Sequence, residues 1–295
     1  DFGAFMTDKE AALYEMPFKH VSEHVRPVRL ANRRKSRSDN WWRHGEARPG
    51  LRRVGKDLCR WLVTPETSKH RIFRWLPKSD NPEHSLIVIA KDDDTTFGIL
   101  QSRFHVAWVQ AHGNRLGIGN DLRYNSTRTF QTFPFPDGLT PNIPAATYAT
   151  DPHAVKIGDV AKRLNELREE WLNPSGLLKR VPEVAQGFPD RILPADDNAA
   201  AILKKRTLTN LYNELPAWLT NAHRDLDAAV AAAYGWPADI SEDDALAAER
   251  ARLREYPPDG VDIAESRDAA ARLSRASGAA TTSAATTSAA TTSAA

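Results

Sequence analysis

The chain has 295 residues, of which 41% are hydrophobic and 26% are charged, and its formal net charge is +2 at pH 7. These fractions lie near globular averages, so a chain that is disordered throughout is excluded. No stretch approaches the roughly 18 consecutive apolar residues of a transmembrane helix, which excludes a membrane-spanning protein. The single cysteine, Cys59, excludes an internal disulfide and a Cys-x-x-Cys metal site, and it favours a reducing, cytoplasmic location.

The charge is distributed unevenly along the chain. Residues 1–80 hold 18 lysines and arginines against 10 acidic residues, whereas residues 81–295 hold 22 against 28. Between residues 19 and 78 the balance is 17 against 5. The cations of such a block repel one another unless an anionic partner lies against them. Nucleic acid is a common partner of this kind, because each phosphate contact releases counterions, so the charge pattern predicts a nucleic-acid-binding protein.

The predicted elements of the first half are mixed. Thr7–Glu10 has the form of a capping box and predicts a helix, whose apolar stripe Pro17 interrupts and Pro27 ends. Pro49 predicts the first turn of a short helix. Further along, the patterns predict strands at 61–64, 71–76, 86–90 and 127–133 and a helix from Thr95 or Thr96 to His112. The apolar run 86–90 is typical of a strand that is buried on both faces.

The second half has a different character. A linker rich in Pro, Thr and Ala is followed by helical patterns at 152–172, 198–212, 222–234 and 241–256. The last residues repeat TTSAA three times from residue 281, and they cannot form a core. We therefore expect an α+β fold, with a mixed α/β domain at 1–139, a linker at 140–151, a mostly helical domain at 152–256 and a disordered tail at 257–295.

Two stretches resemble enzyme motifs. His20 to His24 has the H-x-x-E-H spacing of inverted zinc peptidases, but the downstream candidate for the required third ligand, Glu83, lies in a loop and the surroundings are strongly cationic. We therefore expect two solvated histidines and no metal, and a zinc hydrolase remains an alternative. Gly117 to Asp121 is similar to a nucleotide-binding loop, but it lacks the third glycine and the strand-to-helix context, so we expect a turn or a recognition loop.

The remaining candidate site combines basic and aromatic side chains. Trp41 and Trp42 lie within the basic block, and we expect them in the core, with stacking against arginine stems as the alternative. The cations are expected to contact DNA phosphates rather than to form a merely solvated face. The candidate phosphate-binding residues are Arg33, Arg34, Lys35, Arg37, Arg52, Arg53, Lys69 and Arg71.

Several runs together point to a family. The first is Phe97 to Gly113 (F-G-I-L-Q-S-R-F-H-V-A-W-V-Q-A-H-G), and the second is Leu116 to Pro136, which ends in F-P-F-P. With D-F-G-A-F-M at Asp1 and L-D-A-A-V-A-A-A-Y-G-W-P at Leu226, they resemble the C-terminal part of type IIG and IIL restriction–modification enzymes. The resemblance covers about residues 1–247.

The resemblance implies a function in DNA methylation. The family consists of class I S-adenosylmethionine-dependent enzymes that flip a target adenine out of the duplex and methylate it. Their cofactor-binding glycine motif, their N-P-P-[FY] box and their nuclease domain would precede residue 1, and none of them occurs in this sequence. We therefore expect the sequence-specific DNA recognition portion of an adenine-N6 methyltransferase, a fragment that is inactive alone. S-adenosylmethionine would serve the parent enzyme and would not bind this chain.

The expected partners are double-stranded DNA and, in an alternative, a separate methyltransferase chain with which a stand-alone specificity subunit would act. In the family, base-reading residues are expected around 113–126, where side chains can accept from or donate to the edges of G, A or C in the major groove. The candidates are Arg115, Asn120, Asp121, Arg123 and Asn125, and simple turn formation is the alternative for each.

Overall fold

A computed structural model describes residues 2–45, 48–116, 121–182 and 190–255 of the chain. These residues form two compact units, which divide between Trp61 and Leu62. We call residues 1–61 the N-terminal unit and residues 62–295 the C-terminal unit, and we describe each by itself. The predicted tail at 257–295 lies outside the described residues.

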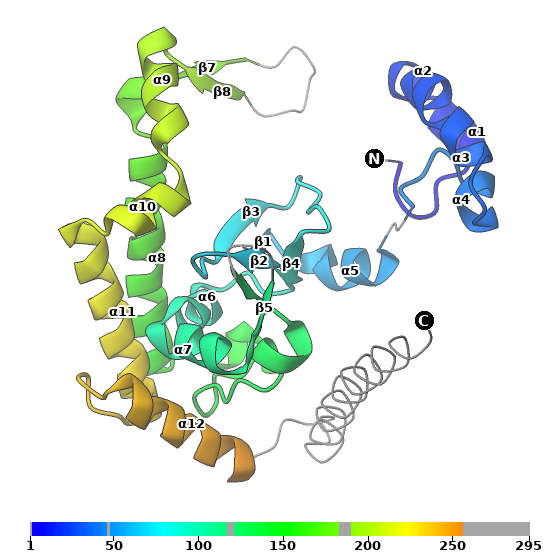
Figure 1. Cartoon of the computed structure of the whole chain (residues 1–295). Coiled ribbons are helices and arrows are strands. Elements are labelled where there is room, and N and C mark those ends of the chain that lie inside the picture. The colour runs from blue at the N-terminus through cyan, green and yellow to red at the C-terminus, as the bar shows by residue number, and fades with distance from the viewer. Residues whose placement is uncertain (1, 46–47, 117–120, 183–189, 256–295) are drawn as a thin grey trace, which may run out of the picture. The chain divides into compact units, whose positions relative to one another are not determined.

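The N-terminal unit is built from short helices (Figure 1). In chain order they are α1 (Asp8–Ala12), α2 (Glu15–His24), α3 (Arg26–Leu30), α4 (Lys35–Asp39) and α5 (Pro49–Val54), followed by a single 3-10 turn at Gly55–Asp57. The predicted capping box is confirmed, because Thr7 accepts from the Glu10 backbone and the Glu10 side chain accepts from the Thr7 backbone. Pro27 does not end a long helix. It lies in the first turn of α3, where a missing N–H costs nothing.

An aromatic cluster holds the N-terminal unit together. The rings of Phe18 and Trp41 lie 5.3 Å apart, and those of Trp41 and Trp42 lie 5.9 Å apart. The Trp42 indole donates to the Met6 carbonyl at 3.0 Å, and Arg43 donates to the same carbonyl at 2.8 Å. Both tryptophans are half-buried, so they pack as the sequence predicts without being fully enclosed.

The C-terminal unit contains three small sheets. The first has the order β3-β1-β4, from β1 (Arg60–Pro65), β3 (Arg74–Pro77) and β4 (Leu86–Ile89), and β1 begins two residues before the unit boundary. The second has the order β2-β6-β5, from β2 (Thr67–Ser68), β5 (Asn114–Leu116) and β6 (Asp121–Arg123). The third pairs β7 (Leu178–Val181) with β8 (Arg191–Pro194). Strand β4 is an edge strand and mostly half-buried, so its predicted burial on both faces is wrong.

Helices cover these sheets and supply most of the core. They are α6 (Asp94–Gln101), α7 (Arg103–His112), α8 (Pro152–Leu172), α9 (Asp197–Lys205), α10 (Leu208–Glu214), α11 (Ala217–Tyr234) and α12 (Glu242–Glu255). The single helix predicted up to His112 is in fact two helices, because Ser102 is extended, with φ −66° and ψ 156°. The strand predicted at 127–133 is also wrong, since Ser126–Phe130 is a short π-helix.

One hydrophobic core runs through the C-terminal unit. It joins Phe97 and Trp108 of the α6–α7 pair to Ile157 of α8 and Leu226 of α11. Figure 1 shows α8 and α11 side by side, and α6 packs against α8. Residues on both sides of the predicted linker at 140–151 therefore share this core. The predicted boundaries between the mixed domain, the linker and the helical domain remain a prediction.

The close approach of α6 and α8 depends on Gly98. A Cβ atom at this position would lie 2.6 Å from the Ile157 Cγ2 and 2.9 Å from the Ala161 Cβ. We expect Gly98→Ala to lower the free energy of unfolding by about 1–3 kcal/mol, the usual cost of overpacking. Urea unfolding followed by circular dichroism measures this. Gly176→Ala is the control, because no atom lies within 4 Å of its added Cβ, and an equal loss in both variants would contradict the packing explanation.

Candidate nucleic-acid interface

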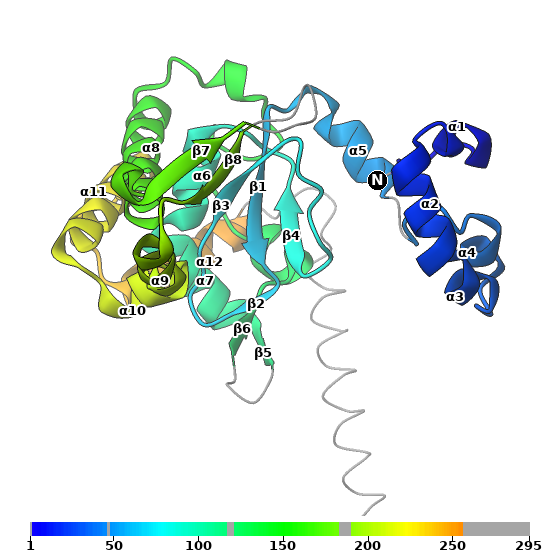
Figure 2. The same ribbon diagram turned by 90° about the horizontal axis from the view of Figure 1, so that it is seen from above.

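The predicted base-reading segment forms a hairpin. Strands β5 and β6 pair antiparallel, with Asn114 opposite Arg123, Arg115 opposite Leu122 and Leu116 opposite Asp121. Figure 2 shows this hairpin extending beyond the sheets and helices of the C-terminal unit. Asn120, one of the predicted base-reading residues, lies outside the described residues.

The hairpin has two faces that carry different side chains. Residues directly opposite one another in an antiparallel ladder share a face, and successive residues alternate between faces. Asp121 and Arg123 therefore share a face with Asn114, whereas Arg115 shares the other face with Leu122. Leu122 is 6% exposed and is fixed against the core. The Asp121–Arg123 face is thus the one that presents two predicted base-reading side chains together.

Arg123 is held by a carboxylate from a distant part of the chain. Its Nε donates to the Glu66 Oε1 at 2.8 Å, and its Nη2 donates to the same oxygen at 2.5 Å. Both side chains remain partly exposed, and Thr67 of β2 lies opposite Arg123 in the ladder. Sequence reasoning missed Glu66, because 57 residues separate the two partners and no local pattern links them.

A turn after β6 completes the base of the hairpin. The Asn125 Oδ1 accepts from the Thr127 N at 3.0 Å and the Arg128 N at 3.3 Å, so it caps the π-helix. This contact accords with the turn-forming alternative for Asn125. The exposed Arg128 donates to the Asn114 Oδ1 at 3.3 Å, which places a further cation beside the hairpin that the sequence analysis did not select.

The predicted phosphate-binding residues differ in exposure. Within the N-terminal unit, Arg33, Arg34, Lys35, Arg52 and Arg53 are exposed and Arg37 is half-buried. Lys35 forms an ion pair with Asp39 at 3.1 Å, in which the lysine side chain is 87% exposed. In the C-terminal unit Lys69 is exposed, and its Nζ donates to the Asn213 Oδ1 at 2.7 Å. These side chains, apart from Arg37, have the accessibility that phosphate contact requires.

Arg71 does not have that accessibility, and we remove it from the set. It is 4% exposed, and its Nη2 donates to the Leu122 carbonyl at 2.7 Å. Its Nη1 donates to the Thr64 hydroxyl at 3.0 Å and to the Pro65 carbonyl, and its guanidinium lies 5.1 Å from the centre of the Tyr124 ring. Burial lowers the pKa of Arg71 to about 10, so it stays charged at neutral pH. Its contacts join β1 to β6.

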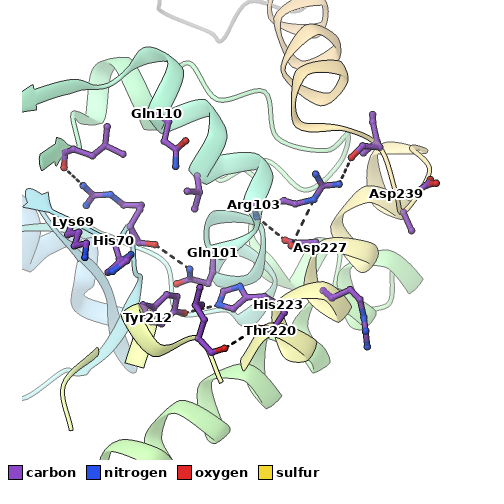
Figure 3. A pocket seen from close by; sticks show the side chains of 17 residues that line it. Lys69, His70, Gln101, Arg103, Gln110, Tyr212, Thr220, His223, Asp227 and Asp239 are labelled. Carbon is purple, nitrogen blue, oxygen red and sulfur yellow. Dashed lines mark hydrogen bonds and ion pairs between the residues drawn. The ribbon is translucent and has the colours of Figure 1, made fainter. Parts of the chain in front are cut away.

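A cleft of about 760 Å³ adjoins the other face of the hairpin. Leu122 forms part of its wall, and residues of α6, α7, α10 and α11 and of the segments 69–71 and 238–240 line the remainder (Figure 3). Lys69 and His70 line one side, and the Tyr212 hydroxyl meets the His223 Nε2 at 2.8 Å. Burial lowers the pKa of His223 to about 4, so this imidazole is neutral at physiological pH.

The charged groups deep in the cleft bind one another. The Arg103 backbone N donates to the Asp227 Oδ1 at 2.8 Å, and the Arg103 Nη2 donates to the Ile240 carbonyl at 2.6 Å. Burial raises the pKa of Asp227 to about 6, although the hydrogen bond from the Arg103 backbone by itself lowers this pKa. These contacts join α7 to α11 and to the segment after it. They give both charged side chains partners within the protein.

The described residues do not bring together a metal site. His20 and His24 are exposed on α2 with their rings 4.6 Å apart, and no third acidic, cysteine or histidine ligand joins them within the described ranges. Among the same residues, no helix is long and apolar enough to cross a membrane.

The segment that contains the hairpin is similar to a known protein family. Residues 6–137 match the family model of the MmeI target recognition domain. Over these residues the chain is similar to the MmeI target recognition domain. The match includes Glu66, the β5–β6 hairpin and helices α4 and α5, so the hairpin and most of the exposed candidate cations lie within the matched residues.

A solved structure supports the same fold. The chain is similar to the type IIL restriction–modification enzyme MmeI, solved in complex with DNA, with a TM-score of 0.51 and 18% sequence identity. The similarity covers 83% of this chain and 27% of that chain, so it extends beyond the recognition domain while spanning a minor part of the enzyme. No curated protein matches the chain.

Proposed function

We propose that this chain binds duplex DNA and selects a specific sequence, as the recognition part of a site-specific adenine-N6 methyltransferase. The observation that carries the proposal is the MmeI-type recognition domain at residues 6–137, with a projecting hairpin that bears Asp121 and Arg123 on one face. Arginine reads guanine and a carboxylate accepts from cytosine in the major groove, so this face has the chemistry to read a base pair.

Phosphate contacts would set the register of the domain on the duplex. Such contacts position a protein without reading sequence, and exposed arginines and lysines supply them. We assign this role to Arg33, Arg34, Lys35, Arg52 and Arg53 in the N-terminal unit and to Lys69 in the C-terminal unit. Arg115 and Arg128 flank the reading face, and base contact is proposed for Arg115, Asp121 and Arg123.

Methyl transfer would need groups from another part of the enzyme. We expect S-adenosylmethionine to bind there and not in this cleft, because the residues that line the cleft include no glycine and so offer no glycine-rich turn between a strand and a helix. The sequence also lacks the N-P-P-[FY] box. The catalytic part would therefore belong to the same longer protein or, in the alternative, to a partner methyltransferase chain.

Binding of the full chain to randomised duplex DNA tests the proposal. Repeated selection and sequencing of the bound fraction should enrich one short sequence, and the affinity should fall steeply between about 50 and 200 mM salt. Binding that enriches no sequence would overturn the recognition function. A chain that does not bind at low salt would overturn DNA binding altogether.

Arg123 should determine preference at one base pair. We expect Arg123→Ala to relax discrimination at that pair by about 1–3 kcal/mol while leaving the other positions unchanged. Competition binding with the enriched duplex and its single-position variants measures this. Arg53→Ala, on exposed α5, is the matched control and should weaken every duplex alike. Equal effects of both variants on all sequences would refute the division of roles.

Glu66 should act through Arg123. Because the Glu66 Oε1 accepts two hydrogen bonds from the Arg123 guanidinium, Glu66→Gln removes the charge that orients it. We expect this variant to alter preference at the same base pair as Arg123→Ala, and the double variant to add little to either change. Independent, additive effects at two different positions would show that Glu66 does not position Arg123.

A further inference from the structure

Strand β5 places two further side chains on the face of the hairpin that carries Asp121 and Arg123. Asn114 lies opposite Arg123 in the ladder and Leu116 lies opposite Asp121, so all four side chains share this face. The other face holds Leu122, which is fixed against the core. Asn114 and Leu116 are both exposed, on the hairpin that Figure 2 shows extending beyond the sheets and helices of the C-terminal unit.

A cation beside the hairpin fixes the amide of Asn114. The Arg128 Nη1 donates to the Asn114 Oδ1 at 3.3 Å. Arg128 is itself held in the capped turn after β6, where its backbone N donates to the Asn125 Oδ1 at 3.3 Å. Because a guanidinium only donates, this contact defines which end of the Asn114 amide is the oxygen. An amide oxygen has two lone pairs, so one remains for a ligand, together with the Nδ2 donor.

An amide oriented in this way is suited to adenine. In the major groove adenine presents its N7 acceptor beside its N6 amino donor, and an asparagine pairs with both at once. The Asn114 Nδ2 would donate to N7, and the remaining lone pair of Oδ1 would accept from N6. Guanine presents two acceptors at the same edge, which would set its O6 against the Oδ1. Asn114 therefore has the chemistry to prefer adenine, whereas Arg123 has the chemistry to prefer guanine.

Leu116 adds an apolar contact to the same face. Its side chain is 52% exposed, although its neighbours on this face, Asn114 and Asp121, are polar. Thymine presents a methyl group in the major groove, and apolar side chains recognise it by burying it. A strand rises about 3.4 Å per residue, so Leu116 and Asn114 lie about 6.8 Å apart along β5. This is about twice the step of 3.4 Å between base pairs, so the two side chains would meet different pairs.

We propose that Asn114 and Leu116 are specificity-determining residues, which read an adenine and a thymine methyl group beside the base pair that Arg123 reads. The inference rests on the proposed function and deepens it, because it names part of the target. The recognised sequence would contain at least two A·T pairs next to a G·C pair. The register of β5 against β6 brings these residues to the face, and the sequence pattern alone does not reveal that register.

Base analogues test each contact at a single atom. The full wild-type chain first enriches a sequence from randomised duplex DNA. At one adenine, replacement by 7-deazaadenine, which lacks the N7 acceptor, should weaken wild-type binding about tenfold, and Asn114→Ala should be insensitive to it. At one thymine, replacement by uracil, which lacks the methyl group, should weaken wild-type binding about threefold, and Leu116→Ala should be insensitive to it.

A change of preference gives a readout that a purely structural role would not produce. A carboxylate accepts but does not donate, so Asn114→Asp should move the preferred base at that position from adenine toward cytosine, whose N4 donates. Asn221→Ala on α11 and Ile192→Ala on β8 replace exposed residues of the same types and are the matched controls. Both controls should keep the wild-type response to the two analogues. Circular dichroism establishes that each variant is folded.

The outcomes distinguish the two proposals. A wild-type chain that binds no duplex, or that enriches no sequence, would overturn the proposed function. If the wild-type chain enriches a sequence but tolerates both analogues at every position, the reading role of β5 alone would be overturned. The same conclusion would follow if Asn114→Ala and Leu116→Ala kept the wild-type response to the analogues.

Discussion

Replacing Glu249 by glutamine should stabilise the chain relative to wild type, and this gain in the free energy of unfolding should grow as the pH rises from acid to neutral. Glu249 lies on α12, which packs against α7, and its side chain is 0% exposed. Neither carboxylate oxygen has a hydrogen-bond partner within the described part of the chain. Burial raises the pKa of this carboxyl to about 8, which the charge of Arg250 only partly offsets.

The sign of the effect follows from the raised pKa. Below about pH 4.5 the carboxyl is protonated in both the folded and the unfolded chain, so its ionisation costs nothing. Between about pH 4.5 and 8 the unfolded chain releases the proton while the folded chain retains it, and stability falls as pH rises. Because glutamine never ionises, the variant should gain on the order of 3 kcal/mol over wild type between about pH 4 and pH 7.

Unfolding of both proteins by urea at a series of pH values measures the gain. Other groups that titrate in this range, such as Asp227, cancel in the difference between variant and wild type. Asp243→Asn, which removes an exposed acid from the same helix, is the control and should give a nearly constant difference. A constant difference for Glu249→Gln as well would contradict the buried, unpaired carboxylate.

The sequence predicted those features whose signals are local. The capping box at Thr7 and Glu10 needs only four residues, and the structure forms it. The helix predicted at 152–172 is observed as Pro152–Leu172, because Asp151 caps its first turn and a proline suits the first position. The family resemblance was correct for the same reason, since two of the runs on which it rested, Phe97 to Gly113 and Leu116 to Pro136, lie within the residues that match the recognition domain.

Features that depend on distant partners were not predictable in this way. The hydrogen bonds between Glu66 and Arg123 join β6 to a residue 57 positions earlier. The β7–β8 ribbon interrupts a region whose composition indicated helix, and its pairing joins Leu178 to Pro194. Ser102 lies inside an apolar pattern that continues across it, so the break between α6 and α7 left no periodic signal. Each of these depends on tertiary contacts that periodicity does not contain.

Arg71 shows how a charge pattern can mislead, and it provides the second strong test. Arginine is almost never fully buried without partners, so the cluster Lys69-His70-Arg71 indicated a DNA-facing surface. In the fold, the carbonyls of Pro65 and Leu122 accept from its guanidinium, and these acceptors come from segments far apart in the sequence. Arg71 therefore stabilises the junction between sheets.

Arg71→Met should accordingly unfold more easily rather than simply bind DNA more weakly. It keeps the bulk of the stem but leaves the Leu122 and Pro65 carbonyls and the Thr64 hydroxyl without this donor, and we expect a loss of about 2–4 kcal/mol in the free energy of unfolding. Lys69→Met, which removes an exposed cation two residues away, should cost no more than about 0.5 kcal/mol. Urea unfolding measures both variants, and binding is compared under conditions where both are folded. If Arg71→Met kept wild-type stability and lost affinity for every duplex, the phosphate-binding role would be restored.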